Sequence, residues 1–272
     1  MPELPEVETI IRELKPLLTG RTIKMVEPLW AKTFVDQAER PVSGQTIRQI
    51  RRIGKYILFD LDQSHLVIHL RMTGRLSIQN NQFDLNDHPH LRCLIYFEDG
   101  SVLLFEDTRK FGRIYHVEQA EQVLKEVGLD AFDPQMTFDY FYSSLKKRKM
   151  GIKAFLMSQK WVAGLGNIYT DESLFKVKIH PEQLCTKIGR KKAKELYDAV
   201  QYILQKAVEN MGSTISDYRD AYGNPGQNQL YFKVYKRAGQ PCFNCGTLIE
   251  KKRVAGRGTH FCPKCQKIRG QE

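Results

Sequence analysis

The chain begins Met1-Pro2-Glu3-Leu4-Pro5-Glu6, so removal of Met1 would leave a proline with a free secondary amine. An ordinary α-amine has a pKa of about 8, and part of it is therefore neutral at physiological pH, unlike a lysine amine at about 10.4. A neutral amine can attack an aldehyde-like carbon and form an iminium, the chemistry of Schiff-base enzymes. Glu3 and Glu6 can supply a general acid and a positioning carboxylate. An ordinary helix start, with acids near the positive helix end, is the alternative that spacing alone leaves open.

Four cysteines near the C-terminus form two close pairs, Cys242-x2-Cys245 and Cys262-x2-Cys265, separated by sixteen residues. Two intervening residues allow a tight turn that directs both sulfurs to one ion, and the spacing fits a four-cysteine zinc site. Disulfides or an iron–sulfur cluster are the alternatives. Because four protein ligands fill a tetrahedral site, we expect one structural zinc ion rather than a catalytic one.

The segment around these cysteines is strongly basic. Residues 233–272 contain ten Lys or Arg against two acids, a net charge of +8. The cations of residues 251–257 lie between the cysteine pairs, where we expect the tip of a hairpin. Gly256 and Gly258 flank Arg257 and allow the backbone to approach a phosphate or a base closely. A solvated charged loop is the alternative, but the zinc hairpin and the basic chain favour nucleic-acid contact.

The segment Gly164-Leu165-Gly166-Asn167-Ile168-Tyr169 is similar to a dinucleotide-binding loop but lacks the third glycine and a preceding strand. We interpret it instead as an anion site, in which Asn167 caps a helix whose amides face a phosphate. The cations of residues 146–149 and Lys153 can line the same groove. A glycine turn beside a solvated face is the alternative.

Two turns place apolar side chains among cations. Met72 lies in Leu70-Arg71-Met72-Thr73-Gly74, and Arg109 and Phe111 lie in the segment 107–113. An apolar side chain in such a turn has the character of a wedge that enters the base stack while an arginine fills the vacated space. Taken alone, either apolar residue is more often part of a core.

Composition narrows the class of protein. The 272 residues, 42% of them hydrophobic, suffice for two or three small domains. No apolar run reaches the ~18 residues that a membrane span needs, and the acids of the first six residues argue against a secretory signal. The net charge of +11 favours a polyanionic partner, nucleic acid before an anionic membrane surface. We expect the remaining cysteines, Cys93 and Cys185, to be small and partly buried, and the paired ones to indicate a reducing compartment.

The secondary-structure elements expected to position these residues change along the chain from one helix, to β-strands, to further helices. Apolar spacing predicts a helix over residues 7–18, ended by Gly20. The β-like runs that follow, with a hairpin turn at Glu98-Asp99-Gly100, favour a β-sandwich or barrel; they span residues 46–53, 56–61, 66–72, 91–97, 102–105 and 113–117. We expect helices near residues 137–147, 152–160, 167–175 and 187–211, and a loop over 222–228.

Together the motifs closely resemble those of bacterial formamidopyrimidine-DNA glycosylases, in order and over the whole chain. The shared segments are Pro2-Glu3-Leu4-Pro5-Glu6-Val7-Glu8-Thr9, Arg51-Arg52-Ile53-Gly54-Lys55-Tyr56, His69-Leu70-Arg71-Met72, Asp107-Thr108-Arg109-Lys110-Phe111-Gly112, Gly164 to Tyr169, and Val254 to Pro263. The resemblance implies a multidomain α+β protein. Its domains would be an N-terminal β-sandwich with an N-terminal helix (residues 1–130), a helix–two-turns–helix domain (131–229) and a four-cysteine zinc finger (230–272), with DNA bound between the two halves.

The same resemblance implies a bifunctional base-excision repair enzyme. It would excise oxidised purines, chiefly 8-oxoguanine and formamidopyrimidines, and then cut the strand at the abasic site by β,δ-elimination. Pro2 would be the Schiff-base nucleophile at sugar C1′ and Glu3 its proton donor. Lys55 matches the lysine of lesion processing and β-elimination, and Arg257 the finger arginine of δ-elimination.

The resemblance assigns binding residues as well. Met72, Arg109 and Phe111 match the triad that fills the gap in the duplex and touches the estranged base. DNA-contact positions fall at His90, Arg109, Arg148, Lys153, Asn167 and Tyr235, and the zinc ligands at Cys242, Cys245, Cys262 and Cys265. The implied partner is double-stranded DNA with oxidised purines or abasic sites. We expect a monomer in the bacterial cytoplasm, with neither a membrane nor an obligate protein partner.

Two segments depart from the family pattern. Ala154-Phe155 stands where many relatives have Pro-Trp, next to Lys153. The loop over residues 213–228, which in the family closes over the everted base, offers few recognisable matches, so the sequence predicts the reaction type better than the lesion preference.

Two rival functions remain. The first is an enzyme of the endonuclease VIII type, for oxidised pyrimidines, against which Leu4 and the triad argue. The second is a DNA-binding zinc protein without catalysis, against which the intact Pro2, Glu3, Lys55 and Arg257 argue.

Overall fold

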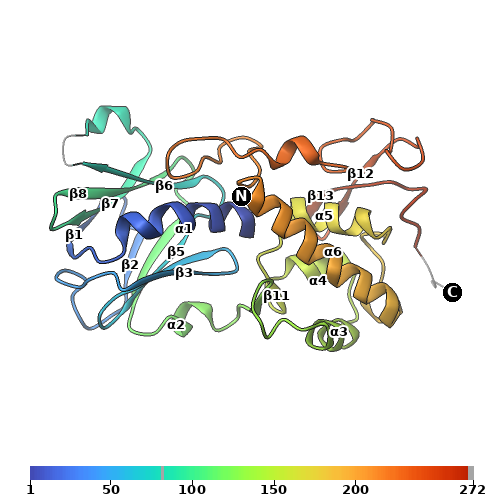
Figure 1. Ribbon diagram of the computed structural model, residues 1–272, viewed down its shortest axis with the longest axis horizontal. Coiled ribbons are helices and arrows are strands. Elements are labelled where there is room, and N and C mark those ends of the chain that lie inside the picture. Colours follow the sequence, from blue (N-terminus) through green and yellow to red (C-terminus); the bar gives the residue numbers. More distant parts are fainter. Residues whose placement is uncertain (81–82, 269–272) are drawn as a thin grey trace. The chain divides into compact units, whose positions relative to one another are not determined.

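The computed structural model describes residues 1–80 and 83–268, which form two compact units (Figure 1). The first unit comprises Met1–Lys125 and Val208–Gln229, and the second Glu126–Ala207 and the chain from Leu230 onward. Among the described residues, no helix combines the length and the apolar composition that a membrane crossing requires.

The first unit opens with helix α1, Leu4–Leu18, which begins three residues before the predicted start because two acids cap it. Glu6, in the first turn, accepts a hydrogen bond from the backbone N–H of Glu3 at 2.8 Å. The helix ends at Leu18, as predicted, and Gly20 follows with a φ of +88° and an N–H that donates to the carbonyl of Ile47. One face of α1 is fully buried and joins the core of this unit.

Two sheets complete the first unit. The four-stranded sheet has the order β1-β7-β8-β6, with β1 at Ile23–Pro28, β6 at Gly74–Asn80, β7 at Leu91–Phe97 and β8 at Ser101–Asp107. The five-stranded sheet has the order β2-β9-β5-β4-β3, with β2 at Phe34–Asp36, β3 at Gln49–Ile53, β4 at Tyr56–Asp60, β5 at His65–His69 and β9 at Arg113–Val117. Side chains of both sheets and of α1 share one hydrophobic cluster, and a short helix α2, Glu121–Leu124, follows β9.

The predicted turn at Glu98-Asp99-Gly100 is present: it joins the antiparallel strands β7 and β8, and Gly100 has a φ of +83°. β1, β2 and β6 were not predicted. β2 has only three residues, and β1 and β6 carry charged or polar side chains among their apolar ones. Short strands of this kind give no clear alternation to detect.

The second unit follows the predicted order of helices: α3 at Phe138–Lys146, α4 at Ile152–Met157, α5 at Asn167–Lys176 and α6 at Arg190–Glu209. A small parallel pair joins β10 at Leu129–Asp130 to β11 at Val162–Ala163, and the antiparallel hairpin β12–β13 spans Glu250–Val254 and Arg257–Phe261. α4 ends earlier than predicted, ahead of Gln159 with a φ of +63°. The mixed α+β class with an N-terminal helix and a C-terminal cysteine module is confirmed.

Candidate active site, DNA-contact residues and metal centre

The N-terminal segment is anchored by one buried carboxylate. Pro2 is buried, and Glu3 and Glu6 are each 2% exposed. Glu6 accepts the N–H of Glu3 through Oε2 at 2.8 Å and the N–H of Ser213 through Oε1 at 2.6 Å. The carboxylate therefore ties the segment that carries Pro2 to a loop more than two hundred residues later in the sequence.

Lys55 lies in the two-residue turn between β3 and β4, where Gly54 has a φ of +59°. Its side chain is buried, with 5% exposed. Arg52 supports the turn: it donates to the carbonyl of Gly54 at 3.3 Å and to Glu8 of α1 at 2.9 Å. Burial would raise the pKa of Glu8, but hydrogen bonds and charge from Arg52 and Arg12 outweigh it and hold that pKa below its usual value. The turn with Lys55 is thus fixed to α1 by an ion pair.

His69, at the end of β5, is a neutral neighbour of this lysine. Burial, and then the charges of Arg71 and Lys55, lower the pKa of His69 to about 3. Its Nδ1 accepts the N–H of Arg71 at 2.9 Å, and its ring meets that of Tyr56 edge-on. His69 is not among the predicted site residues; the only signal for it was its place beside Leu70 and Met72 in a shared motif.

The three predicted wedge residues are brought together in the first unit. Met72 is 37% exposed and Phe111 is 48% exposed, so neither is a core residue. Arg109 joins them: its Nη1 lies 2.8 Å from the Met72 sulfur, and its guanidinium carbon 4.8 Å from the Phe111 ring centroid. Two exposed apolar side chains therefore flank one arginine at the surface.

Asp107 organises both turns that carry this triad. It is 1% exposed, and its Oδ1 accepts the hydroxyl of Thr73 and the N–H of Arg109, while Oδ2 accepts the N–H of Gly112 at 2.7 Å. At Gly112 a Cβ would lie 2.4 Å from the Phe105 ring, so the turn has room only for glycine. One buried carboxylate thus sets the geometry of the wedge, a role that the motif in the sequence did not suggest.

A cavity of about 330 Å³ opens beside these turns, the size of a small ligand pocket. One side of it belongs to the sheets and their turns, including His90, an exposed residue predicted to contact DNA. The other side belongs to the loop tied to Glu6; the lining residues are Thr73, Arg75, His90, Glu106, Asp107, Thr108, Ser216, Asp217 and Arg219.

In the second unit, Arg257 occupies the predicted position beside a hairpin tip. Ala255 and Gly256 form the two-residue turn between β12 and β13, with φ values of +49° and +73°. Arg257 follows directly and is exposed, as are Lys251, Lys252 and Arg253 on β12. The finger thus presents its cations to solvent.

Helix α5 holds the finger strand in place. Asn167 donates from Nδ2 to the carbonyl of Gly258 at 2.9 Å, and Asp171, one turn later, accepts the N–H of His260 at 2.9 Å. The predicted capping role of Asn167 is wrong: Gly166 is the cap residue, and the Asn167 side chain is turned to β13 instead. This arrangement places Arg257 at the start of a strand that α5 fixes.

Lys153 is completely buried, and its Nζ lies 2.6 Å from Oδ1 of the equally buried Asp171. Arg148 lies with its guanidinium carbon 4.6 Å from the centroid of the Trp161 ring, which stacks on Phe155. Phe155 thus backs the ring on which Arg148 lies, and α4 runs unbroken through Ala154-Phe155.

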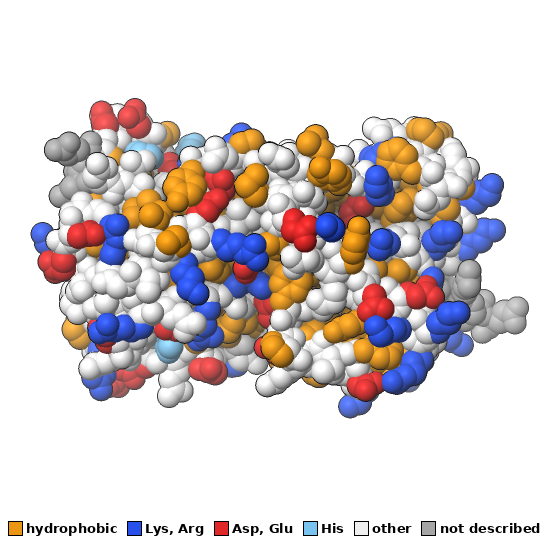
Figure 2. Space-filling model, in the orientation of Figure 1, with side chains coloured by type: hydrophobic (Ala, Val, Ile, Leu, Met, Phe, Trp, Pro, Cys, Tyr) orange, Lys and Arg blue, Asp and Glu red, His pale blue; other side chains and the backbone are white. Residues whose placement is uncertain are grey.

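Tyr235 belongs to a segment that a second buried acid anchors. Glu172 accepts the backbone N–H groups of Lys233, Val234 and Tyr235 at 2.8 to 3.1 Å. Burial raises the pKa of Glu172, and these three donors oppose the rise. The Tyr235 ring lies edge-on to that of His260. Figure 2 shows Lys and Arg side chains spread over the visible face around α5, α6 and the hairpin.

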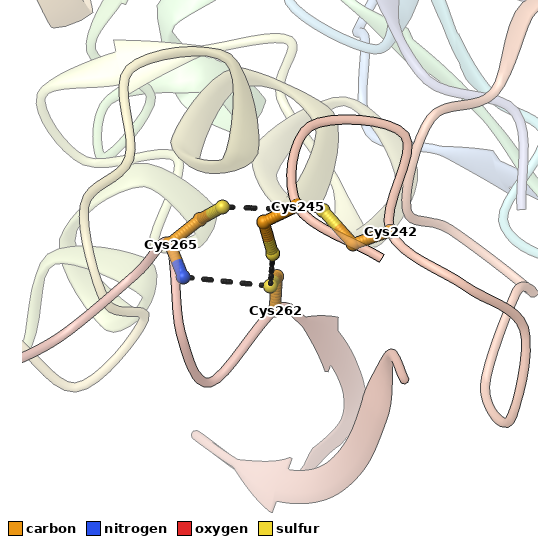
Figure 3. Close-up of side chains that lie close together, drawn as sticks. All are labelled: Cys242, Cys245, Cys262 and Cys265. Atoms are coloured by element: carbon orange, nitrogen blue, oxygen red, sulfur yellow. Dashed lines mark hydrogen bonds between the residues drawn. The ribbon is translucent and has the colours of Figure 1, made fainter. Parts of the chain in front are cut away.

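The four predicted zinc ligands gather at one point. Their sulfur atoms all lie within 4.8 Å of one another, with Cys242 and Cys265 3.9 Å apart and Cys245 and Cys262 3.5 Å apart. Figure 3 shows the side chains of the two knuckles turned toward each other. A tetrahedral ion with zinc–sulfur bonds of about 2.3 Å would place the sulfurs roughly 3.8 Å apart, so the cluster fits zinc.

Hydrogen bonds to the sulfurs support the same conclusion. The N–H groups of Asn244 and Cys265 point at the sulfurs of Cys242 and Cys262, each at 3.4 Å. Four sulfur ligands complete the coordination, so the chain holds one structural zinc ion, which leaves no open position for catalysis.

Comparison with known proteins gives a match for each part of the chain. A model of the formamidopyrimidine-DNA glycosylase N-terminal domain matches residues 1–114, one of the H2TH domain of the same glycosylases matches residues 127–219, and one of the zinc finger found in FPG and IleRS matches residues 239–268. The formamidopyrimidine-DNA glycosylase of Bacillus licheniformis is 42% identical over 277 residues, covering 98% of this chain and 100% of the relative. That of Protochlamydia amoebophila is also 42% identical, with the same coverage.

Solved structures of similar proteins superpose on nearly the whole chain. The crystal structure of MutM (Fpg) from Thermus thermophilus superposes with a TM-score of 0.87 at 37% identity, covering 98% of this chain and 99% of that one. The complex of Lactococcus lactis Fpg with DNA containing an abasic site gives a TM-score of 0.87 at 35% identity, covering 97% and 99%. The wild-type Lactococcus lactis protein with DNA containing N7-benzyl-Fapy-dG gives 0.87 at 35%, covering 98% and 100%.

Proposed function

The chain belongs to the formamidopyrimidine-DNA glycosylase family, enzymes that excise damaged bases from DNA and act as abasic-site lyases. From this premise we propose that it binds damaged duplex DNA, excises 8-oxoguanine and formamidopyrimidines through a Schiff base on Pro2, and cleaves the strand by β,δ-elimination. Relatives of known structure bind DNA with an abasic site or a formamidopyrimidine lesion.

The observation that carries the proposal is the buried N-terminal segment. Glu6 holds the backbone N–H of Glu3 on one oxygen and that of Ser213 on the other. Pro2 is therefore fixed at the start of a capped helix, with an acid as its next residue. A nucleophile and a proton donor held on a rigid element are what covalent attack at a sugar carbon requires.

The proposed first reaction uses the neutral amine that removal of Met1 exposes. Its nitrogen bonds to C1′ while the glycosidic bond breaks, and the bonding pair leaves with the base. The nitrogen loses its own proton to the departing base, and Glu3 protonates the ring oxygen as the sugar opens, which gives the iminium. The iminium makes the C2′ hydrogen acidic, so strand cleavage follows from the same adduct.

We assign the elimination steps to two cations. Loss of the C2′ proton to water expels the 3′ phosphate, and loss of the C4′ proton to water in a second elimination expels the 5′ phosphate. Lys55 is suited to the first, because the histidine beside it is neutral and adds no like charge. Arg257, exposed next to the hairpin tip, is suited to the second.

Access to C1′ requires that the nucleotide leave the stack, at a cost of a few kcal/mol. In the proposal, Met72 and Phe111 enter the duplex while Arg109 contacts the estranged base. His90, Arg148, Lys153, Asn167 and Tyr235 contact the backbone. For Lys153 this requires that its ammonium reach a phosphate from a buried ion pair with Asp171.

The lesion itself is proposed to contact the loop that lines the 330 Å³ cavity with Ser216, Asp217 and Arg219. We further propose that the protein acts as a monomer in the bacterial cytoplasm. Its domains would be residues 1–130, 131–229 and 230–272.

The test is reduction with borohydride in the presence of DNA that contains an abasic site. We expect a covalent adduct, and digestion with mass spectrometry should place the modification on Pro2. Lys55→Gln is the matched control, since it removes the other candidate amine and should still form the adduct. An adduct on Lys55, or none, contradicts the proposal. Base release from 8-oxoguanine rather than thymine glycol duplexes separates it from the endonuclease VIII type.

A further inference from the structure

The loop over residues 213–228, whose sequence gave few family matches, is closely connected within itself. The N–H of Asn228 donates to the carbonyl of Gly212, and the N–H of Gly226 to the hydroxyl of Thr214, each at 2.9 Å. At Gly226 a Cβ would lie 2.3 Å from the Gly212 carbonyl oxygen, so the two ends of the loop are in backbone contact. The loop can therefore move as one piece.

This loop lies along one face of α1. The N–H of Ser213 binds Glu6 at 2.6 Å, and the N–H of Ala221 binds Oε2 of Glu13 at 2.8 Å. Between them the Tyr218 hydroxyl reaches the carbonyl of Glu6 at 3.4 Å. Glu6 and Glu13 are seven residues apart, two helical turns, so the helix presents two carboxyl groups as attachment points.

The second attachment point is a pair of carboxyl groups. The side chain of Glu13 is hydrogen-bonded to that of Asp220, which is 3% exposed. Two carboxyl groups can share a hydrogen bond only if one of them carries a proton. Oδ1 of Asp220 accepts the N–H groups of Tyr222 at 3.0 Å and Asn224 at 2.7 Å, so this oxygen is already occupied by two donors. We therefore place the shared proton on Glu13.

The surroundings of Glu13 also favour its protonated form. Burial, together with the charge and the hydrogen bond of Asp220, raises the pKa of Glu13 to about 7, against the opposing bond from Ala221. The other ionisable groups near this contact are Tyr218, whose pKa burial and the charges of Glu6 and Glu13 raise, and Arg75 of β6, which reaches Gly223.

We propose that Glu13 and Asp220 form a proton-dependent latch that fastens loop 213–228 to α1 and so positions the loop for the damaged base. The link to the damaged base rests on the proposed function, but the latch itself does not. Glu13 acts through the loop and is a positioning residue.

The pH dependence follows from the proton count. A free Glu13 titrates at its ordinary value of 4.5 and the docked one at about 7, so the docked loop holds one more proton between these values. Docking therefore weakens as pH rises through this interval, by at most about tenfold per pH unit, and levels off above it.

The experiment measures hydrogen–deuterium exchange of residues 213–228 from pH 5 to pH 8, corrected for the intrinsic exchange rate. In Glu13→Gln the amide can donate to Asp220 and accept from Ala221 with no titrating proton, so protection should become independent of pH. Asp220→Asn should do the same by donating to the Glu13 carboxylate, and it keeps the test available if the first variant does not fold. Glu39→Gln, an exposed acid of the same unit, is the matched control and should keep the unmodified slope.

A parallel assay measures single-turnover release of 8-oxoguanine. The ratio of the Glu13→Gln rate to the unmodified rate should rise with pH between 5 and 7, while the ratio for cleavage of preformed abasic sites stays near unity. Equal exchange slopes in the variants and the unmodified chain, or no slope in the latter, overturn the latch. A latch that behaves as expected in a protein that releases no oxidised purine would instead contradict the proposed function alone.

Discussion

Buried carboxylates do much of the positioning in this chain at the scale of single residues. Glu6, Asp107 and Glu172 are each nearly inaccessible, and each accepts two or more backbone N–H groups. A charged acceptor forms stronger hydrogen bonds than a neutral one, and loss of the acid would leave several buried donors unpaired. The role of such an acid depends on which backbone groups the fold brings to it. Residue spacing does not show this, so the sequence did not single out Asp107 or Glu172.

His69 gives a prediction about stability and pH. Its pKa of about 3 lies below the ordinary value of 6.5, so the unfolded chain binds one more proton between these values. The unfolding free energy should therefore fall as pH decreases through this interval, by at most about 1.4 kcal/mol per pH unit from this group.

The measurement is urea unfolding of the zinc-bound protein from pH 4 to pH 7, compared with His69→Asn. The variant removes the titrating ring and should show a smaller slope over this interval. His65→Asn, on the same strand, removes a different histidine and serves as the control. An unchanged slope in His69→Asn would show that His69 is protonated as easily in the folded protein as in the unfolded one.

At the scale of elements, helix α5 is the support of the finger. Glu172 binds three consecutive N–H groups at the start of the finger segment, and Phe175 joins Val234 and Ile249 in its small core. Glu172→Gln loses the charge and one acceptor oxygen, so we expect about 1–3 kcal/mol of destabilisation of this unit. The measurement is thermal unfolding together with DNA affinity.

Glu182→Gln is the matched control for this change. Glu182 binds Lys252 of the same finger, but the pair is solvent-exposed, with 52% of the lysine side chain and 33% of the glutamate side chain accessible. Exposed ion pairs contribute about 0–1 kcal/mol, so this variant should unfold almost as the unmodified protein does. Equal losses of stability and DNA affinity in both variants would show that Glu172 does not anchor the finger.

The elements that sequence predicted are those with strong periodicity or a strong turn signal: α1, β7–β8, and the long helix α6. Those it missed are short or polar, such as β2 and β6. The cap of α5 was assigned one residue too late, because Asn167 is a good capping residue but its amide binds β13. A tertiary contact outweighed a local preference that is worth about 1 kcal/mol.

At the scale of the whole molecule, zinc removal should affect DNA binding and the first unit differently. The described residues contain one candidate metal cluster, and all four of its cysteines belong to the second unit. Chelation should therefore lower DNA affinity by about tenfold or more, the equivalent of 1.4 kcal/mol, while the sheets of the first unit keep their hydrogen-exchange protection. Loss of protection in β7 and β8 would contradict this, and readdition of zinc is the control for reversibility.

At this scale the sequence predicted the fold class and the cysteine cluster. The cluster is marked by cysteines at a fixed spacing, and the class by family motifs that run along the whole chain. It could not predict that Lys153 is buried against Asp171, or that loop 213–228 lies along α1. Both depend on pairs of residues that are distant in sequence. The division into domains at residues 130 and 229, and the catalytic and DNA-contact roles, stay predictions.

The triad of Met72, Arg109 and Phe111 is held by contacts among its own members, on turns that Asp107 locks. In the proposed role, side chains that are already held in place lose little conformational entropy at each encounter with DNA. The rate at which such a protein searches DNA would then depend on the free energy needed to unstack each base step. Steps beside a lesion, where that free energy is lower, would hold the protein longest.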